Sequence, residues 1–323
     1  MMSTGLKMFV LFMAAFAIMI VSAPAFIPLL RRLKFGQTIR QEGPESHLVK
    51  NGTPTMGGIM IIVAFCIPAA FIIGKNEEAI APCAMTLLFG LVGFLDDFIK
   101  VKKKSSGGLK AWQKMGLQIL FTGLVIAYMY WFSDISLAIK IPFAYGMEFN
   151  LGWLVIPFDF LVIIGTDNGA NFTDGLDGLL SKVTLVILGF LLLVAFKENS
   201  GLIYPIIIMM GALLGFLVFN CHPAKVFMGD TGSLAIGGFV ALCAIELKVP
   251  VFLLIIAFVY VAEVGSVMLQ VSYFKLTHGK RIFKMAPIHH HFEKSGWKET
   301  KVVSIFTIAT AILCAIGVIA LYV

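Results

Sequence analysis

Long apolar stretches alternate with short polar segments along the whole chain. A helix that crosses a bilayer needs about 20 mostly apolar residues. The alternation predicts ten such helices, over residues 8–30, 56–73, 80–99, 111–132, 151–170, 179–196, 202–219, 233–245, 249–274 and 302–323. We therefore expect an all-α, polytopic integral membrane protein.

Composition supports this class of protein. Of the 323 residues 59% are hydrophobic and 13% are charged, and the mean hydropathy is +0.95. The first apolar stretch is longer than a signal-peptide core and further stretches follow it, so we interpret it as a retained helix. No separate soluble domain is expected, and residues 1–323 form a single integral membrane catalytic domain. The five cysteines contain no CxxC pair, so they suggest neither a disulfide framework nor a zinc site.

Basic residues are concentrated in alternate loops. All but five of the 25 lysines and arginines lie in or beside the odd-numbered loops, the exceptions being Lys7, Lys75, Lys140, Lys197 and Lys248. By the positive-inside rule the odd loops are cytoplasmic and both termini lie outside. The net charge of +7 therefore reports topology and gives no indication of nucleic-acid binding.

The polar motifs follow the same division. All six histidines lie in odd loops, together with GTPTMGG (52–58), DDFIK (96–100), NFTDGLDGLL (171–180), FMGDTGS (227–233) and PIHHHFE (287–293). The even loops contain no comparable cluster. The chemistry is therefore expected on the cytoplasmic face of the membrane.

Asp96 and Asp97 close the third apolar stretch, and Lys100 follows one turn later. Carboxylates at a helix C-terminus oppose the helix dipole, so either Lys100 or a metal ion should compensate their charge. The plainer alternative is a helix end that has simply reached water.

Asn171, Asp174 and Asp177 recur at intervals of three residues. They would share roughly one face of a helix, or Asp174 would cap the sixth helix if the segment turns. A capping loop without further function is the alternative.

Asp230 lies between Gly229 and Thr231, where the N-cap of the eighth helix is expected. Asn220, Lys225 and Phe227 precede it on the same loop. An amide, a cation and an aromatic ring around one carboxylate suit a nucleotide better than a simple cap.

Three weaker patterns remain. GTPTMGG opens the second helix, whose N-terminus favours anions, but it lacks the spacing of a phosphate-binding Walker motif. Residues 289–291 are consecutive histidines, which cannot all face one metal from regular structure, so phosphate or hydroxyl contacts are preferred. Glu263, Ser266 and Gln270 form a polar stripe typical of hydrogen bonds between helices. We assign no role to Asp167.

Taken together, these motifs indicate phosphoryl transfer. Carboxylates without a cysteine or clear histidine ligand favour a hard cation, and Mg²⁺ is the usual choice beside phosphates. Lys50, Lys100 and Lys114 supply phosphate-binding charge on the same face. Positioning and charge neutralisation provide most of the catalysis in this class of reaction. A site at the membrane surface can meet a soluble phosphate donor and a lipid phosphate acceptor.

Six segments resemble, in order, those of the polyprenyl-phosphate N-acetylhexosamine-1-phosphate transferases: KNGTPTMGG, DDFIK, GLKAWQK, NFTDGLDGLL, NCHPAKVFMGDTGS and PIHHHFEK. The Asp-Asp pair and TDGLDG are shared by the whole superfamily. PIHHHFE and GTPTMGG resemble the phospho-N-acetylmuramoyl-pentapeptide transferase branch. The resemblance extends from Arg31 to the last apolar stretch, and the local departures in NCHPAKV and TDNGANFTD concern specificity at most.

The resemblance implies a reaction. Phospho-MurNAc-pentapeptide passes from UDP-MurNAc-pentapeptide to undecaprenyl phosphate, giving lipid I and UMP in peptidoglycan synthesis, with Mg²⁺ required. It also implies the bacterial plasma membrane and a homodimer. We favour direct attack by the lipid phosphate over an aspartyl intermediate, because the donor's diphosphate needs only charge neutralisation to leave.

The resemblance also implies roles for individual residues. Asp230 matches the magnesium ligand, and Asp96 and Asp97 match the pair that receives and deprotonates or orients the lipid phosphate. The uridine pocket would be lined by Lys50, Gly175, Leu176, Asp177 and Phe227, with Phe227 as the stacking ring. Other polar site positions are Thr55, Lys100, Lys114, Asn171, Asp174, Asn220, His289 and His290.

Two other functions stay open at this point. A sister enzyme that transfers GlcNAc-1-phosphate from UDP-GlcNAc would share most of these motifs. A secondary transporter would place charged groups near the bilayer midplane and would often show inverted repeats. The acidic groups here gather at one interface instead, and no convincing half-to-half repeat is present.

Overall fold

The computed structural model describes residues 3–33, 52–74, 76–103, 107–133 and 135–323. Within these ranges the chain is mostly helical. The α-helices are α1 (Thr4–Arg32), α2 (Gly58–Ile73), α3 (Ile80–Lys103), α4 (Ala111–Phe132), α5 (Val155–Thr173), α6 (Leu179–Lys197), α7 (Ile203–Asn220), α8 (Gly229–Glu246), α9 (Leu253–Ile256), α10 (Phe258–Leu276), α11 (Ile288–Glu293) and α12 (Glu299–Ala320). Short 3₁₀ turns η2 (Glu77–Ala79), η3 (Gly152–Leu154) and η4 (Pro250–Phe252) precede α3, α5 and α9.

One small sheet departs from the all-helical prediction. Strands β1 (Ala138–Lys140) and β2 (Glu148–Asn150) pair antiparallel in the loop between α4 and α5. The backbone of this hairpin also binds the last residues of the chain, since Phe143 N–H donates to Ala320 O at 3.0 Å and Tyr145 N–H donates to Val323 O at 2.8 Å. The hairpin therefore ties the α4–α5 loop to the end of α12.

The structure supports a multi-pass membrane protein. Seven helical segments in the described ranges are long and apolar enough to cross a membrane, and α9 with α10 supplies an eighth if the bent pair is one span. All ten predicted stretches coincide with helices. However, α2 is a shorter apolar helix and α8 is not among the seven, so ten crossings stay a prediction. The single continuous ninth helix is wrong, because α9 and α10 meet at a bend of 82°.

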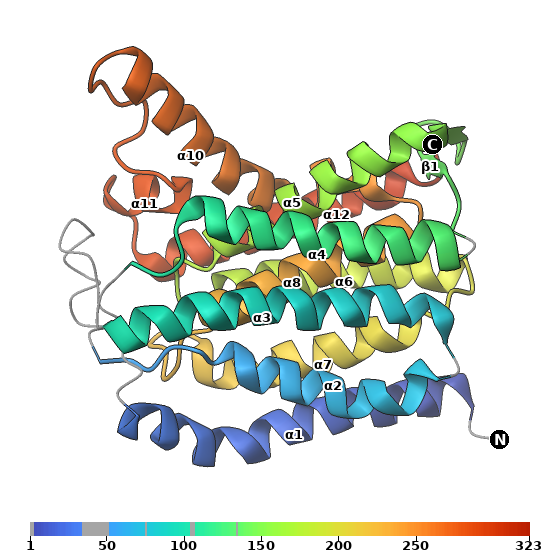
Figure 1. The fold of residues 1–323 in the computed structure, drawn as a ribbon, viewed down its shortest axis with the longest axis horizontal. Coiled ribbons are helices and arrows are strands. Elements are labelled where there is room, and N and C mark those ends of the chain that lie inside the picture. The colour runs from blue at the N-terminus through green and yellow to red at the C-terminus, as the bar shows by residue number, and fades with distance from the viewer. Residues whose placement is uncertain (1–2, 34–51, 75, 104–106, 134) are drawn as a thin grey trace.

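The helices lie roughly side by side in one bundle, and only α10 projects from it (Figure 1). Helix α8 packs against α2, α3, α5 and α6, and α1 packs against α7. The start of α1 and the C-terminus lie at one end of the bundle, whereas the turn between α5 and α6 and the segment around α11 lie at the other (Figure 1). The charge pattern predicted this separation. Which end faces the cytoplasm stays a prediction.

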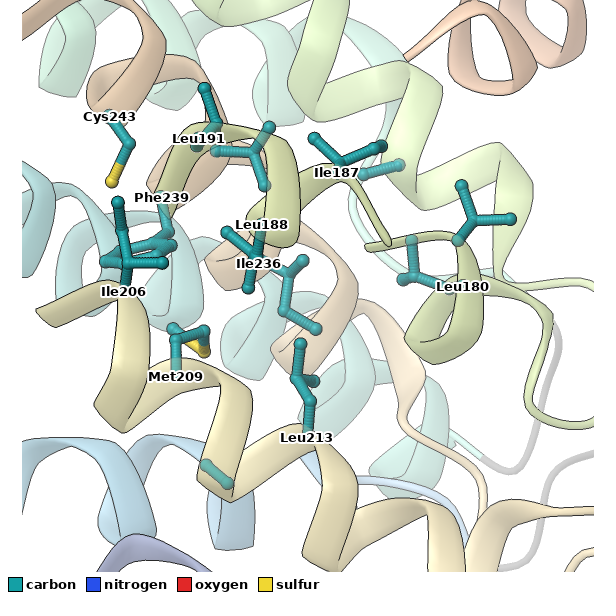
Figure 2. Close-up of a cluster of buried hydrophobic side chains, with 14 of the residues drawn as sticks. Leu180, Ile187, Leu188, Leu191, Ile206, Met209, Leu213, Ile236, Phe239 and Cys243 are labelled. Atoms are coloured by element: carbon teal, nitrogen blue, oxygen red, sulfur yellow. The ribbon is translucent and has the colours of Figure 1, made fainter. Parts of the chain in front are cut away.

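Helix α8 is the centre of the fold. Every residue from Thr231 to Ile245 is buried, so the helix is enclosed on all sides. Figure 2 shows side chains of α6, α7 and α8 converging, among them Leu188, Met209 and Ile236. This packing holds the first turn of α8 in a fixed place.

Glycines allow the helices around that first turn to touch through their backbones. A Cβ added at Gly58 of α2 would lie 2.1 Å from Gly232 N of α8. A Cβ added at Gly93 of α3 would lie 2.1 Å from Asp230 O. Small residues permit this close approach between membrane helices. The contacts bring the first turn of α8 directly against the C-terminal half of α3.

Candidate active site

Three carboxylates converge where α3 meets the start of α8. One oxygen from each of Asp96, Asp97 and Asp230 lies within 4.8 Å of the other two, a grouping that could hold a metal ion. Asp96 and Asp97 are buried, and Asp230 is partly exposed. Sequence analysis had assigned the metal to Asp230 alone.

Lys100 contacts all three carboxylates. Its Nζ lies 2.5 Å from Asp96 Oδ2, 3.1 Å from Asp230 Oδ2 and 3.7 Å from Asp97 Oδ1. The expected compensating cation is therefore present in the chain itself. The alternative of a bare helix end in water is wrong, because α3 continues to Lys103 and both aspartates are buried inside it.

Each aspartate of the pair is fixed by a different element. Asp97 Oδ2 accepts hydrogen bonds from Thr231 N–H at 2.9 Å and from Thr231 Oγ1 at 2.8 Å. Asp96 Oδ1 accepts from Leu109 N–H at 2.6 Å, and a Cβ added at Gly108 would overlap this carboxylate. Asp97 is thus held by α8, and Asp96 is held by the segment that leads into α4.

Asp230 has two further partners. Lys114 Nζ of α4 lies 3.1 Å from Asp230 Oδ2 and 3.1 Å from Asn171 Oδ1. Asn171 Nδ2 of α5 donates to Asp230 Oδ1 at 3.1 Å and to Ser233 Oγ at 2.8 Å. Two lysines and an amide therefore surround the Asp230 carboxylate. The lysines place positive charge beside the cluster of three aspartates.

A second polar contact between α4 and α5 lies one helical turn away from the contact between Lys114 and Asn171. Gln118 of α4 follows Lys114 by four residues, and Asp167 of α5 precedes Asn171 by four. Gln118 Nε2 donates to Asp167 Oδ2 at 2.5 Å, and both side chains are buried. Asp167, which had no role from sequence, therefore pairs α5 with α4 beneath the candidate site.

Asp177 belongs to a different group of side chains. Its Oδ2 accepts from Ala224 N–H at 3.0 Å and lies 3.2 Å from His222 Nδ1. Its backbone N–H donates to Glu299 Oε1 at 2.7 Å. The predicted common face of Asn171, Asp174 and Asp177 is wrong, because α5 ends at Thr173 and the chain turns before Asp177.

Asn220 joins two loops of the site. Its Oδ1 accepts from Gly178 N–H at 3.1 Å, and its Nδ2 donates to Val226 O at 3.0 Å. The amide thereby fixes the α5–α6 turn, which includes the buried Leu176, relative to the segment before α8. Phe227, predicted to stack on uridine, is partly exposed in that segment.

Two predicted helix caps are wrong. Helix α8 begins at Gly229 with Met228 as its N-cap, so Asp230 lies inside the first turn and its oxygens are turned to Lys100, Lys114 and Asn171. Helix α6 has Gly178 as its N-cap, and Asp174 instead follows the last residue of α5. Burial raises the pKa of the Asp174 carboxyl well above its usual range, and the nearby negative charges of Asp230, Asp97 and Asp177 raise it further.

The start of α2 does not offer the anion site that GTPTMGG suggested. The N–H groups of Gly57 and Gly58 donate to Phe227 O and Met228 O, both at 2.9 Å. These donors are therefore used in joining α2 to the segment before α8. Thr55 is buried against Gly229, where an added Cβ would lie 2.8 Å from Thr55 Oγ1. Lys50 lies outside the described residues.

His289 is buried beneath the α5–α6 turn. Its Nδ1 lies 3.0 Å from Glu263 Oε2, and a Cβ added at Gly175 would lie 2.2 Å from its Nε2. His290 Nδ1 lies 2.8 Å from Glu293 Oε2. His291 Nδ1 accepts from Lys284 N–H at 3.1 Å. The three histidines thus have different partners, as expected from their being consecutive.

The polar stripe of α10 holds the segment that follows it. Glu263 binds His289 of α11, which is the predicted bond between helices. Gln270 Oε1 instead accepts the backbone N–H groups of Ile282 and Phe283, both at 3.0 Å. The stripe therefore positions the loop that carries PIHHHFE.

Sequence reasoning missed several residues of the site. Thr231 and Ser233 stand within FMGDTGS, so their motif could have pointed to them. Gln118 lies one turn after Lys114, a spacing that places both on one helix face. Glu299 and His222 gave no usable signal, because their partner Asp177 is far from both in sequence.

Comparison with known proteins identifies the family. The family model "Glycosyl transferase family 4" matches residues 79–248, and the "Phospho-N-acetylmuramoyl-pentapeptide-transferase signature 1" matches residues 50–62. A protein of Clostridium botulinum (strain Alaska E43 / Type E3) with the name phospho-N-acetylmuramoyl-pentapeptide-transferase is 48% identical over 308 residues, which cover 95% of this chain and 94% of the relative. A protein of the same name from Acetivibrio thermocellus is 49% identical over 314 residues, covering 96% and 94%. The chain therefore belongs to glycosyl transferase family 4 and, within it, to the phospho-N-acetylmuramoyl-pentapeptide-transferases.

Proposed function

We propose that this chain transfers phospho-MurNAc-pentapeptide from UDP-MurNAc-pentapeptide to undecaprenyl phosphate, forming lipid I and UMP at the cytoplasmic face of the bacterial plasma membrane. The observation that carries the proposal is the cluster of Asp96, Asp97 and Asp230 beside Lys100 and Lys114, in a member of this family. The charge pattern of the loops supports the cytoplasmic side, where a soluble nucleotide is available. A homodimer stays a prediction.

The carboxylate cluster fits Mg²⁺. Its ligand atoms are hard oxygens, which Mg²⁺ prefers, and three of them lie close enough to share one ion. Asp96, Asp97 and Asp230 are the residues that would hold it. When bound, Mg²⁺ supplies neutralisation and polarisation of the donor's diphosphate. Lys100 contacts the same three carboxylates, so its side chain would neutralise part of their charge beside a bound ion.

The chain's own cations and carboxylates account for the remaining requirements. Lys100 and Lys114 form a positive frame that would bind the transferring phosphate and stabilise charge as UMP departs. Asp97 accepts two hydrogen bonds from Thr231, so its carboxylate is fixed in place. A fixed carboxylate suits the role of supporting the cation and the diphosphate. Asp96 is bound to Lys100 and lies next to Gly108, which suits the residue that orients or deprotonates the lipid phosphate.

The nucleotide would lie beside this centre. Gly175, Leu176 and Asp177 of the α5–α6 turn, Phe227 and Lys50 are the proposed uridine contacts. Asn220 supports this assignment, because its two hydrogen bonds hold the turn and the segment of Phe227 in one arrangement. The donor's diphosphate would then extend from this pocket toward Asp230.

Donor specificity tests the function. Purified protein is given undecaprenyl phosphate and Mg²⁺ with either UDP-MurNAc-pentapeptide or UDP-GlcNAc, and UMP release is measured. We expect release with the muramoyl donor only. Release with UDP-GlcNAc alone would assign the sister activity, and no release with either donor would contradict transfer.

The division of labour between the two aspartates has its own test. Asp96→Asn should depress turnover strongly and leave binding of a UDP-sugar analogue nearly intact in titration calorimetry. Loss of nucleotide binding as severe as the loss of turnover would contradict this division of roles.

A further inference from the structure

A second group of possible metal ligands lies apart from the carboxylate cluster. Asp177 comes from the α5–α6 turn, His222 from the segment after α7, and Glu299 is the first residue of α12. His222 Nδ1 lies 3.2 Å from Asp177 Oδ2 and 3.5 Å from Glu299 Oε2. All three ligand atoms lie within 4.8 Å of one another. Three elements that are distant in sequence thus place one nitrogen and two carboxylate oxygens around a single point.

The distances are compatible with three ligands that share one metal ion. Zn²⁺ binds imidazole nitrogen and carboxylate oxygen at about 2.0–2.2 Å, so neighbouring ligands of a tetrahedral site are separated by about 3.3–3.5 Å. The separations of 3.2 and 3.5 Å from His222 Nδ1 match this spacing. The 3.2 Å separation from Asp177 Oδ2 also lies within hydrogen-bonding range, whereas the 3.5 Å separation from Glu299 Oε2 is longer than a charge-assisted N–H···O hydrogen bond of about 2.7–2.9 Å.

The group is also held in place by backbone hydrogen bonds. Asp177 Oδ2 accepts from Ala224 N–H at 3.0 Å. Glu299 Oε1 accepts from Asp177 N–H at 2.7 Å, which leaves its Oε2 facing His222. The side chains of Asp177 and Glu299 are only 2% and 8% exposed, whereas that of His222 is 44% exposed. Two carboxylates are therefore preorganised, and the imidazole lies where a solvated ion can reach it.

We propose that Asp177, His222 and Glu299 form a second cation site, selective for Zn²⁺ or a similar borderline divalent ion. Imidazole favours such ions over Mg²⁺, which prefers a site made of oxygen ligands such as Asp96, Asp97 and Asp230. An ion at this site would join the α5–α6 turn to α12 and to the segment before α8. It would also compete with the nucleotide for Asp177, a consequence that rests on the proposed function.

Cobalt spectroscopy tests the site without any need for turnover. Full-length protein in detergent is titrated with Co²⁺ in a large excess of Mg²⁺, which keeps the carboxylate cluster occupied. We expect one Co²⁺ per chain with the visible absorption of a tetrahedral site, displaced by Zn²⁺. His222→Ala should abolish the absorption, and Glu299→Gln should weaken Co²⁺ binding. The matched control His278→Ala, an exposed histidine elsewhere, should bind Co²⁺ like the wild type.

The melting temperature of each variant shows whether it folds. A second measurement needs no substitution: in the wild type, bound Zn²⁺ should protect the His222 imidazole from an acylating reagent. Absence of a Co²⁺ site that withstands Mg²⁺, or equal binding by His222→Ala, would overturn the proposal. In a separate experiment, Zn²⁺ should weaken UMP binding to the wild type and not to His222→Ala. Zn²⁺ that binds without weakening UMP binding would overturn the link to the nucleotide and leave the metal site standing.

Discussion

The contact between α3 and α8 should be the most sensitive point of the candidate site. Gly93 touches the backbone of Asp230 so closely that the added Cβ of Gly93→Ala would lie 2.1 Å from Asp230 O and 2.5 Å from Thr231 N. Ordinary contact begins at about 3.5 Å, so the helices would have to separate locally by more than about 1 Å. Backbone atoms form the obstacle, and no side-chain rotation can relieve it.

The consequence follows from the hydrogen bonds that cross this contact. Thr231 binds Asp97 at 2.8 and 2.9 Å, and Lys100 binds Asp230 at 3.1 Å. A separation of about 1 Å takes these bonds beyond hydrogen-bonding range. Overpacking costs about 1–3 kcal/mol of stability, and a misplacement of this size costs about 100-fold in rate. Gly93→Ala should therefore lose stability and, per folded molecule, nearly all turnover.

A second glycine provides the control. Gly189 in the middle of α6 has nothing within 4 Å of an added Cβ. Gly189→Ala should keep wild-type turnover, and its higher helix propensity should leave stability equal or greater by up to about 1 kcal/mol. Both variants are measured by UMP release and by thermal unfolding in detergent. Turnover and melting temperature of Gly93→Ala that equal those of Gly189→Ala would refute the close contact and the geometry derived from it.

Two further predictions concern the two polar contacts between α4 and α5. Lys114→Met should reduce turnover by about 100-fold or more with little change in melting temperature, since it removes the cation that we propose binds the transferring phosphate. Unchanged turnover, measured by UMP release, would contradict this proposed role. Asp167→Leu should lower the free energy of unfolding by about 1–3 kcal/mol, because the buried donor of Gln118 loses its acceptor. Asp167→Asn keeps an acceptor and should lose less, and equal melting temperatures for the two variants would show that this hydrogen bond contributes nothing.

Much of the fold could be predicted because helix positions follow directly from apolar runs of spanning length. The gathering of the motifs at one end of the bundle likewise follows from alternation of the loops, and Lys100 could be paired with Asp96 and Asp97 from helix spacing alone. The same reasoning failed where polar residues continue a helix. Helix α3 runs on to Lys103 through its charged turn, and α8 begins before Asp230, because tertiary partners neutralise those charges.

Contacts between distant segments could not be predicted from the sequence. The convergence of Glu299 and His222 on Asp177, and of Glu263 on His289, depends on how whole helices pack. Gly93 carried no local signal, since its importance comes from the backbone of Asp230. The bend between α9 and α10 also interrupts a sequence that is apolar on both sides of the break.

The central claim is that Asp96, Asp97 and Asp230 form the cation centre of a phosphoryl transferase. Mn²⁺, which suits the same oxygen ligands as Mg²⁺, can be counted by electron paramagnetic resonance in the preparation used for UMP release. We predict that Asp230→Asn loses one bound Mn²⁺ per chain and loses turnover together with it, while the protein stays folded. Unchanged Mn²⁺ binding in this variant would contradict the assignment. Undiminished turnover of the wild-type protein in excess chelator would contradict it as well.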